Sequence, residues 1–348
     1  LVGTELRNKT IGIVGLGKIG REVMTRCLSF GMRVIGCDPY ITDNIFSSDD
    51  VRLTDLDTLT KESDFISVHV PKLDSTNNLF DLERIMDPND PLNPDLVIAN
   101  PGFSISYIGF NIQMAPFDDM KFRQALNHAI DKQLIAEEVL SNLVTPAYGI
   151  LPPGFPGYNE QLQGLRYDSE LAKQLLAESK YSDADTRPRI VITVPGRGGS
   201  VGLDMEVILE MWRQVLGVEV EIQQVEWATY LEDLNQNKFQ AFAGLGWEAD
   251  YPDPQDFLDI LFHSDSKINH GQYSNGKVDL ILENARINPD PVERVKLYQS
   301  AEQQIITDAA WVPLWFEGER HVLIKPYVKG YRLTPMTVPK LSQVKIEK

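Results

Sequence analysis

Residues 106–140, SYIGFNIQMAPFDDMKFRQALNHAIDKQLIAEEVL, decide the fold of the larger part of this chain. The stretch begins with an apolar run typical of a β-strand. Apolar residues then recur at helical spacing, at Phe122, Leu126, Ile130 and Ile135. Asp118 or Asp119 stands at the expected N-cap, where a carboxylate accepts a hydrogen bond from a free backbone N–H group. The stretch therefore predicts a strand followed by a helix.

The same alternation continues toward the C-terminus. We expect helices at 169–179, 201–216 and 227–235, and strands at 190–194, 218–225 and 239–245. Strands that alternate with helices are typical of an α/β sheet. An apolar, turn-rich segment, AYGILPPGFPGY at 147–158, lies between the helix that begins near Asp119 and the helix expected at 169–179.

A second strand-turn-helix pattern lies near the N-terminus, in KTIGIVGLGKIGREVMTRCLSFGMRVIGCDPY at 9–40. Gly15 permits a tight turn, Gly17 would let a pyrophosphate approach bare backbone, and Gly20 lets the helix pack closely on the strand. The helix N-terminus would face the anion with free N–H groups. Asp38 follows Gly20 by 18 residues, at the end of the next apolar run. This spacing completes a dinucleotide-binding fingerprint, and the carboxylate of Asp38 favours NAD over NADP.

A helix expected at 53–62 and a strand at 64–71 would complete a β-α-β-α-β unit. The segments GTELRNKTIGIVGLGKIGREV, SFGMRVIGCDPYI and SDFISVHVPKLDSTNNLF resemble the NAD-binding domain of D-3-phosphoglycerate dehydrogenase and other D-2-hydroxyacid dehydrogenases. The resemblance implies that Lys18 and Ile19 contact pyrophosphate, Asp38 the ribose, and Val70 with Pro71 the adenine edge. The Arg, Glu and His motifs that perform catalysis in that family are not found, so we predict no catalytic residue and at most half of an NAD site.

The chain changes character at residues 82–95, LERIMDPNDPLNPD, which contain three prolines and five Asp or Asn residues. Proline removes backbone donors and restricts the preceding residue, so this segment is expected to be a linker. A long surface loop within one natural domain is the alternative. We favour a fusion point, because the family resemblance changes here.

The larger part resembles the family 5 solute-binding proteins of oligopeptide and dipeptide ABC importers. The motifs that carry this resemblance, in family order, are YIGFN, PFDDMKFRQALNHAIDK, PAYGILPPGFPGY, YDSELAKQLLAES, WRQVLGVEVEIQQVEWATYL, GWEADYPDPQDFL and AEQQIITDAAWVPLWF. The resemblance implies a peptide site in which Asp250 pairs with the ligand's α-ammonium, Trp247 forms an aromatic wall and Tyr251 lies beside them. Asp250 as a turn cap and Trp247 as a core residue are the alternatives.

The predicted fold class is α/β, with a partial Rossmann β-α-β-α-β unit joined to a lobe like that of a type II periplasmic binding protein. The expected domains are the partial NAD-binding unit at 1–81, a linker with a remnant of lobe I at 82–111, lobe II at 112–329, and a return to lobe I at 330–348. Much of lobe I is missing, which would leave a ligand exposed to water on one side.

Charge and cysteine content narrow the possible partners. The formal net charge is −17, and residues 1–81 contribute −3 of it, so the acidic character lies mostly in the larger part. Such a charge argues against nucleic acid or an anionic membrane surface as a partner. Cys27 and Cys37 form no disulfide framework. The five histidines, at 69, 128, 263, 270 and 321, lack metal-ligand spacing, so no metal is expected.

Three functions are compatible with the sequence. The first is peptide binding for an ABC importer, with the importer's permease as partner if the chain is exported. The second is an NAD-dependent D-2-hydroxyacid dehydrogenase, and the third is an artificial or misassembled chimera with neither activity intact. The larger part implies an extracytoplasmic location. The chain as written shows no signal peptide and no apolar run long enough to enter a membrane, which would keep it cytoplasmic.

Overall fold

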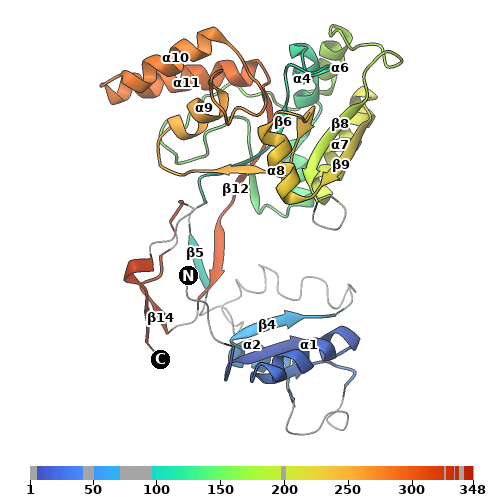
Figure 1. The fold of residues 1–348 in the computed structure, drawn as a ribbon, viewed down its shortest axis with the longest axis vertical. Helices are drawn as coiled ribbons and strands as arrows, with labels where there is room; N and C mark the ends of the chain where they lie inside the picture. The colour runs from blue at the N-terminus through green and yellow to red at the C-terminus, as the bar shows by residue number, and fades with distance from the viewer. Residues whose placement is uncertain are drawn as a thin grey trace. The chain divides into compact units, whose positions relative to one another are not determined.

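A computed structural model of the 348-residue chain describes residues 6–41, 51–70, 96–99, 101–196, 201–324, 327–332, 334–336 and 341–347. The chain forms two compact units (Figure 1). Unit 1 comprises 1–98, 321–330 and 344–348. Unit 2 comprises 99–320 and 331–343.

Unit 1 contains a parallel four-stranded sheet in the order β3-β2-β1-β4. Its strands are β1 (Thr10–Val14), β2 (Arg33–Cys37), β3 (Arg52–Leu53) and β4 (Phe65–Val68), and its helices are α1 (Lys18–Ser29) and α2 (Leu56–Glu62). The elements expected from the sequence are present. The short strand β3 is additional and takes Leu53, the first residue that we expected to be helical, and α2 begins three residues later because Asp55 caps it by accepting from the Thr58 N–H group.

The two helices of unit 1 pack on separate clusters of strand residues. Val23 and Cys27 of α1 pack with Ile11 and Ile13, whereas Leu59 of α2 packs with Val14 and Ile35. Successive residues of a strand point to opposite faces of its sheet, so each helix covers one face. Two small sheets complete the regular structure of this part of the chain, β5 (Leu96–Ala99) with β13 (Arg320–Leu323) and β14 (Val328–Lys329) with β15 (Lys345–Ile346).

Unit 2 is built on a seven-stranded mixed sheet in the order β7-β12-β6-β10-β8-β9, with β11 paired to β6. The strands are β6 (Ser104–Phe110), β7 (Val144–Pro146), β8 (Ile190–Pro195), β9 (Val220–Val225), β10 (Ala241–Phe242), β11 (Gly246–Glu248) and β12 (Trp311–Glu317). Strands β9, β8 and β10 run parallel, and β6 runs antiparallel to β10, β11 and β12. The α/β sheet expected from the alternating pattern is therefore confirmed. Strand β6, which the sequence placed in a remnant of lobe I, lies in the middle of this sheet.

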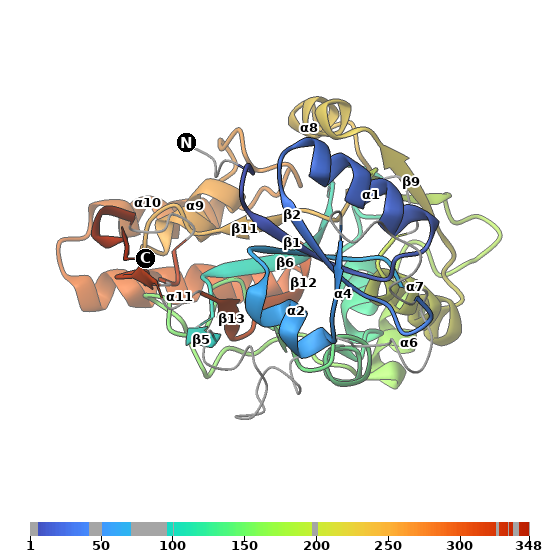
Figure 2. The same cartoon turned by 90° about the horizontal axis from the view of Figure 1, so that it is seen from below.

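The helices of unit 2 are α4 (Met120–His128), α5 (Lys132–Leu134), the π-helical turn η2 (Ile135–Val139), α6 (Ser169–Ala177), α7 (Leu203–Leu216), α8 (Trp227–Asn235), α9 (Gln255–Phe262), α10 (Gly276–Ile287) and α11 (Pro291–Thr307). Helices α9, α10 and α11 gather at one end of the unit, and α4, α6 and α7 at the other (Figure 2). Each group closes its own hydrophobic cluster against the sheet.

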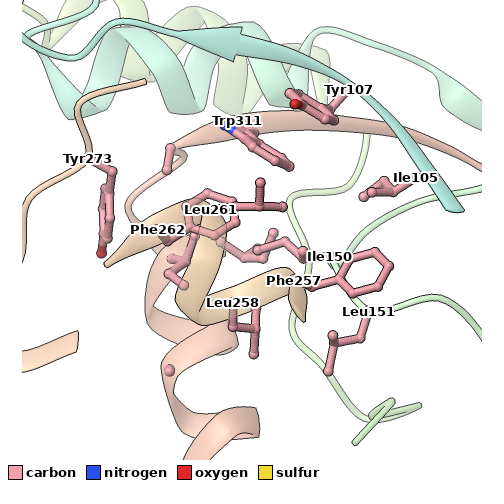
Figure 3. Packing of buried hydrophobic residues seen from close by; sticks show 14 of the residues in the cluster. Ile105, Tyr107, Ile150, Leu151, Phe257, Leu258, Leu261, Phe262, Tyr273 and Trp311 are labelled. Atoms are coloured by element: carbon pink, nitrogen blue, oxygen red, sulfur yellow. The ribbon is translucent and has the colours of Figure 1, made fainter. Parts of the chain in front are cut away.

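Aromatic side chains fill the cluster beneath α9 and α11. The ring of Tyr107 on β6 stacks on Trp311 of β12, with ring centroids 3.5 Å apart, and Trp311 in turn contacts Phe262 of α9 (Figure 3). Burial of rings on this scale is the main favourable contribution to the stability of a unit of this size. It also fixes the position of β6, which carries two residues of the candidate site.

Two elements differ from the sequence-based expectation. The helix expected to run through Ile135 ends at His128, and Asp131 caps a new turn by accepting from the N–H group of Leu134. The strand expected at 239–245 is reduced to β10, because Gly244 adopts φ +79°, a left-handed conformation that ends a strand. The N-cap of α4 is Asp119, one of the two residues proposed for it.

Candidate functional site

The parallel strands of unit 2 end together at one edge of the sheet. Strand β8 ends at Pro195, its parallel neighbour β10 at Phe242 and β9 at Val225. Ligands of open α/β sheets bind in the crevice outside the carboxyl ends of parallel strands. This edge is therefore the first place to search for a site.

A cavity of about 310 Å³ lies at that edge. It is bounded by the carboxyl end of β8, the first turn of α7, the segment between β10 and β11, and the middle of β6 and β12. Six of its lining residues determine its shape and polarity: Tyr107, Val194, Asp204, Met205, Gln224 and Trp315. The volume is at the lower end of the range typical of small-ligand sites.

The cavity lies where both neighbours of β6 depart from regular pairing. In β12 the register shifts between Pro313 and Trp315, so that Leu314 is an extra residue opposite Tyr107 and Ser106. On the other side, Phe242 pairs with Gly109 and Gly246 with Ser106, so three residues (243–245) face only two of β6. Bulges of this kind re-aim side chains and are frequent beside functional sites. Leu314 and Gly244 both line the cavity.

One carboxylate dominates the charge of the cavity wall. Asp204, in the first turn of α7, is the one charged residue among those that line the cavity in the described part of the chain. Its Oδ2 lies 3.4 Å from the indole Nε1 of Trp315, which donates to it. Tyr107 also lines the cavity, but its ring is stacked on Trp311 in the aromatic cluster, where burial raises the pKa of its phenol far above the ordinary value. The wall therefore mixes polar and apolar surface, and Asp204 is its one charged group among the described residues.

The structure places Asp250 on an exposed loop that follows β11. The backbone N–H group of Asp250 donates to Oδ2 of Asp256 at 2.9 Å, which leaves the carboxylate of Asp250 facing solvent. Burial raises the pKa of Asp256, and the nearby charge of Asp250 also raises it. The same loop is tied to α11, because Arg294 donates from Nη1 and Nη2 to the two carboxylate oxygens of Asp253, each at 2.8 Å.

Trp247 lies on β11 opposite Ile105 of β6 and is half-buried against the aromatic cluster. This packing corresponds to the core alternative, and the wall role stays a prediction. Tyr251, beside Asp250, is 37% exposed. The three residues of the predicted peptide site thus follow one another along a single strand and loop.

These three residues follow a cavity-lining residue along the chain but do not line the cavity themselves. Gly246, which precedes Trp247, lines the cavity, whereas Trp247, Asp250 and Tyr251 do not. The sequence did not identify Asp204 or Gln224 as site residues. One signal could have indicated them: both lie close to the carboxyl end of a predicted parallel strand, where ligand contacts concentrate.

The glycine-rich turn of unit 1 has the close packing that its pattern predicts. Gly15 adopts φ +88°, and a Cβ on Gly20 would clash with the carbonyl oxygen of Gly15. Gly17, by contrast, is exposed and has nothing within 4 Å of a built Cβ. It is the N-cap of α1 and provides no side-chain cap for the first N–H groups of the helix.

Asp38 is engaged by the backbone. Its Oδ2 accepts from the N–H group of Leu16 at 2.8 Å and its Oδ1 from that of Tyr40 at 2.9 Å. Lys18 and Ile19 are exposed on the first turn of α1, and Val70 packs against the cluster beneath α2. Pro71, the remaining predicted contact, lies outside the described residues.

Within the described ranges, no group of three or more His, Cys, Asp or Glu side chains is placed to hold a metal ion. No helix in this part of the chain has the length and apolar character needed to cross a membrane.

The fold of unit 2 defines a class of protein: an α/β protein with a cavity at the carboxyl edge of its parallel strands. Comparison with protein families assigns the chain more closely. Residues 40–269 match the middle part of the bacterial extracellular solute-binding proteins, family 5. The chain belongs to this family. The match begins at Tyr40, inside the segment that we expected to be an NAD-binding unit.

Several characterised proteins are similar in sequence. The chain is 33% identical to heme-binding protein A of Haemophilus influenzae over 262 residues, which is 74% of this chain and 46% of that protein. It is 32% identical to the periplasmic oligopeptide-binding protein OppA of Escherichia coli over 268 residues, 75% of this chain and 48% of that protein. The chain spans about half the length of these curated relatives.

Solved structures agree with this assignment. The oligopeptide-binding protein AppA of Bacillus subtilis, in complex with a nonapeptide, superposes with a TM-score of 0.65 at 26% identity, over 77% of this chain and 55% of that one. The periplasmic binding protein DppA of Helicobacter pylori, in complex with the peptide STSA, gives a TM-score of 0.66 at 25% identity over 81% and 57%.

Proposed function

We propose that this chain binds peptides through unit 2, as the solute-binding component of an ABC importer, outside the cytoplasmic membrane. The observation that carries the proposal is the cavity between the two bulged neighbours of β6, at the carboxyl edge of the parallel strands. Membership of family 5 supports it, as does the likeness to two structures that hold peptides. The permease of the importer would be the protein partner.

Within this proposal, Asp250 receives the α-ammonium group of the peptide. Its carboxylate is exposed, and its backbone is held by the Asp256 carboxylate, so the acceptor is positioned before the ligand arrives. Trp247 would supply an aromatic wall that accepts varied side chains by contact area, and Tyr251 would add a second ring. A charge-assisted hydrogen bond to a desolvated ammonium contributes about 1.5 to 3 kcal/mol.

We further propose that most of 112–329 corresponds to lobe II of a two-lobed binder, together with β6, which lies in the middle of the same sheet, and that the part of 82–111 before β6 and 330–348 are parts of lobe I. A ligand that is held by one lobe keeps one side in water. Burial supplies much of the affinity of a small ligand, so the affinity of this chain for peptides should be weaker than that of a closed two-lobed site.

Isothermal titration calorimetry tests the proposal with a tri-alanine peptide and its N-acetylated counterpart. We expect the free peptide to bind at least tenfold more tightly, because acetylation removes the positive charge that faces Asp250. Asp250→Asn should abolish this difference. Asp265→Asn is the matched control: it is an exposed aspartate on the loop after α9, and its removal should leave the difference unchanged.

The proposal fails if neither peptide produces heat at millimolar concentration. Hemin should be titrated in parallel, since heme-binding protein A of Haemophilus influenzae is also similar to this chain. Binding of hemin without binding of peptide would reassign the ligand to a different chemical class within the same family.

A second proposal concerns the first eighty residues. We propose that they form a partial dinucleotide-binding unit, fused to the solute-binding part, that retains half of an NAD site. The exposed Gly17 at the uncapped start of α1 supports this, because free N–H groups there suit a pyrophosphate. Asp38 would have to exchange its backbone partners for ribose hydroxyls. NADH fluorescence with the chain and with Gly17→Asp tests the idea, and an unchanged NADH spectrum up to millimolar protein would end it.

A further inference from the structure

The cavity at the carboxyl edge carries a negatively charged side chain to which the proposed function assigns no role. Asp204 is the one charged residue among the lining residues that the structure describes, and no lining lysine or arginine neutralises it. Its donor within the wall is the indole N–H group of Trp315, a neutral group 3.4 Å away. Among the lining residues that the structure describes, no cationic side chain therefore accompanies this carboxylate.

A helix N-terminus usually attracts anions, and α7 begins at this cavity with Gly202 as N-cap. Here the first turn of α7 already carries two carboxylates, Asp204 and Glu206. Their charge offsets the partial positive charge of the helix end, which amounts to about half an elementary charge. A carboxylate of a ligand would thus meet net repulsion at this cavity, and a cation would meet attraction.

The apolar part of the wall fits the stem of a long basic side chain. Val194 and Met205 are buried, and they line the cavity together with the indole of Trp315. Lysine and arginine bury their methylene stems along apolar surface while the charged end reaches a polar partner. An indole face also attracts a cation. The cavity volume of about 310 Å³ leaves room for such a side chain.

We infer that this cavity is a specificity pocket for a lysine or arginine side chain of the bound peptide, with Asp204 as the partner of its charge. The inference rests on the proposed function, because it names the class of peptide that unit 2 prefers. It is separate from the role proposed for Asp250, which faces the main-chain ammonium of the ligand and does not line this cavity.

Three series of tripeptides test the inference by calorimetry. In each series one position of tri-alanine is replaced in turn by lysine, by norleucine, which has the same stem without the charge, or by glutamate. We expect lysine to bind about tenfold more tightly than norleucine at one position, and glutamate to bind most weakly there. Asp204→Asn should remove the preference for lysine while the norleucine peptide binds as before.

Two further variants make the result specific. Glu206→Gln removes a carboxylate from the same helical turn that does not line the cavity, so the preference for lysine should change less than twofold. Gln224→Glu adds a second carboxylate to the wall and should strengthen the preference about threefold. Because this variant is measured as a gain, it remains informative if Asp204→Asn folds poorly.

The outcomes separate the two proposals. If tripeptides bind but lysine and norleucine are equal at every position, or Asp204→Asn keeps the preference, the pocket has no such role and the proposed function stands. A preference for glutamate over norleucine would mean that the pocket favours negative charge, and it would overturn the inference. If no tripeptide binds at all, peptide binding itself is wrong, and this inference falls with it.

Discussion

The N–H group of Asp250 donates to Oδ2 of Asp256 across 2.9 Å, so a buried carboxylate at the start of α9 holds the exposed loop that follows β11. Asp256→Ala would leave this N–H group without its acceptor. We expect a loss of about 1 to 3 kcal/mol in the free energy of unfolding. Urea denaturation measures it. Asp256→Asn keeps an acceptor oxygen and should lose less than half as much; equal losses would show that the hydrogen bond is unimportant.

Glu302 makes the stability of unit 2 depend on pH. The side chain is buried on α11, and its Oε1 accepts from the N–H groups of Ile150 and Leu151 at 2.7 and 2.9 Å. Burial raises its pKa from 4.5 to about 7, against the lowering effect of these hydrogen bonds. The folded state therefore holds the proton more tightly than the unfolded state, and stability falls as pH rises from about 4.5 to 7.

Glu302→Gln removes this titration and keeps an acceptor for the same N–H groups. We expect the fall in unfolding free energy between pH 4.5 and 7.5, on the order of 2 to 3 kcal/mol for the unmodified chain, to be largely absent in the variant. Urea denaturation at several pH values is the measurement. Glu293→Gln, exposed on the same helix, is the control and should follow the unmodified chain. Parallel pH profiles for the two variants would contradict the assignment.

The glycine turn of unit 1 offers a matched pair of substitutions. Gly20→Ala places a methyl group against the carbonyl oxygen of Gly15, closer than van der Waals contact allows, whereas Gly17→Ala meets nothing within 4 Å. The first should cost about 1 to 3 kcal/mol through overpacking and the second less than about 0.5. Hydrogen exchange of the amides of β1 and α1 reports on unit 1 directly. Equal protection in the two variants would mean that the turn is packed more loosely than described.

Two hydrogen bonds from the guanidinium group of Arg294 to the carboxylate of Asp253 connect the loop after β11 to α11. Arg294→Lys retains the charge but cannot make both hydrogen bonds, so we expect a loss of about 1 to 2 kcal/mol. A double-mutant cycle with Asp253→Asn isolates the pair from other effects. The exposed pair of Lys296 with Glu293 on the same helix is the reference, and breaking it should cost less than about 0.5 kcal/mol. A coupling energy no larger than that of the reference would refute the prediction.

Local patterns predicted most elements of the fold. Helix α8 occupies the residues predicted for it, 227–235, and the structure adds its N-cap, Glu226, which accepts from two N–H groups of its first turn. The strand expected at 239–245 is confirmed at Ala241 and Phe242 but not at 239–240 or 243–245, and Gly244 in its left-handed conformation follows the end of the strand. An apolar run alone does not contain that information.

The site was less predictable than the fold. Trp247 and Asp250 came from resemblance, and their role in binding stays a prediction. Asp204 was not anticipated, because its place in the cavity wall depends on the contact of α7 with Trp315, a residue 111 positions away along the chain. A contact between residues so far apart along the chain leaves no local pattern in the sequence. The dehydrogenase resemblance of residues 1–81 also stays a prediction, although the strands and helices it implied are present.

In the bulged strand β12, a change of length after the extra residue Leu314 would be far more damaging than a substitution. Side chains alternate in direction along a strand, so one residue inserted between Leu314 and Trp315 would reverse every side chain that follows. Trp315 would turn away from Asp204, and Phe316 would leave the aromatic cluster. Evolutionary change at this edge should therefore proceed by exchanging side chains at constant length, which alters what the cavity accepts while its frame is kept.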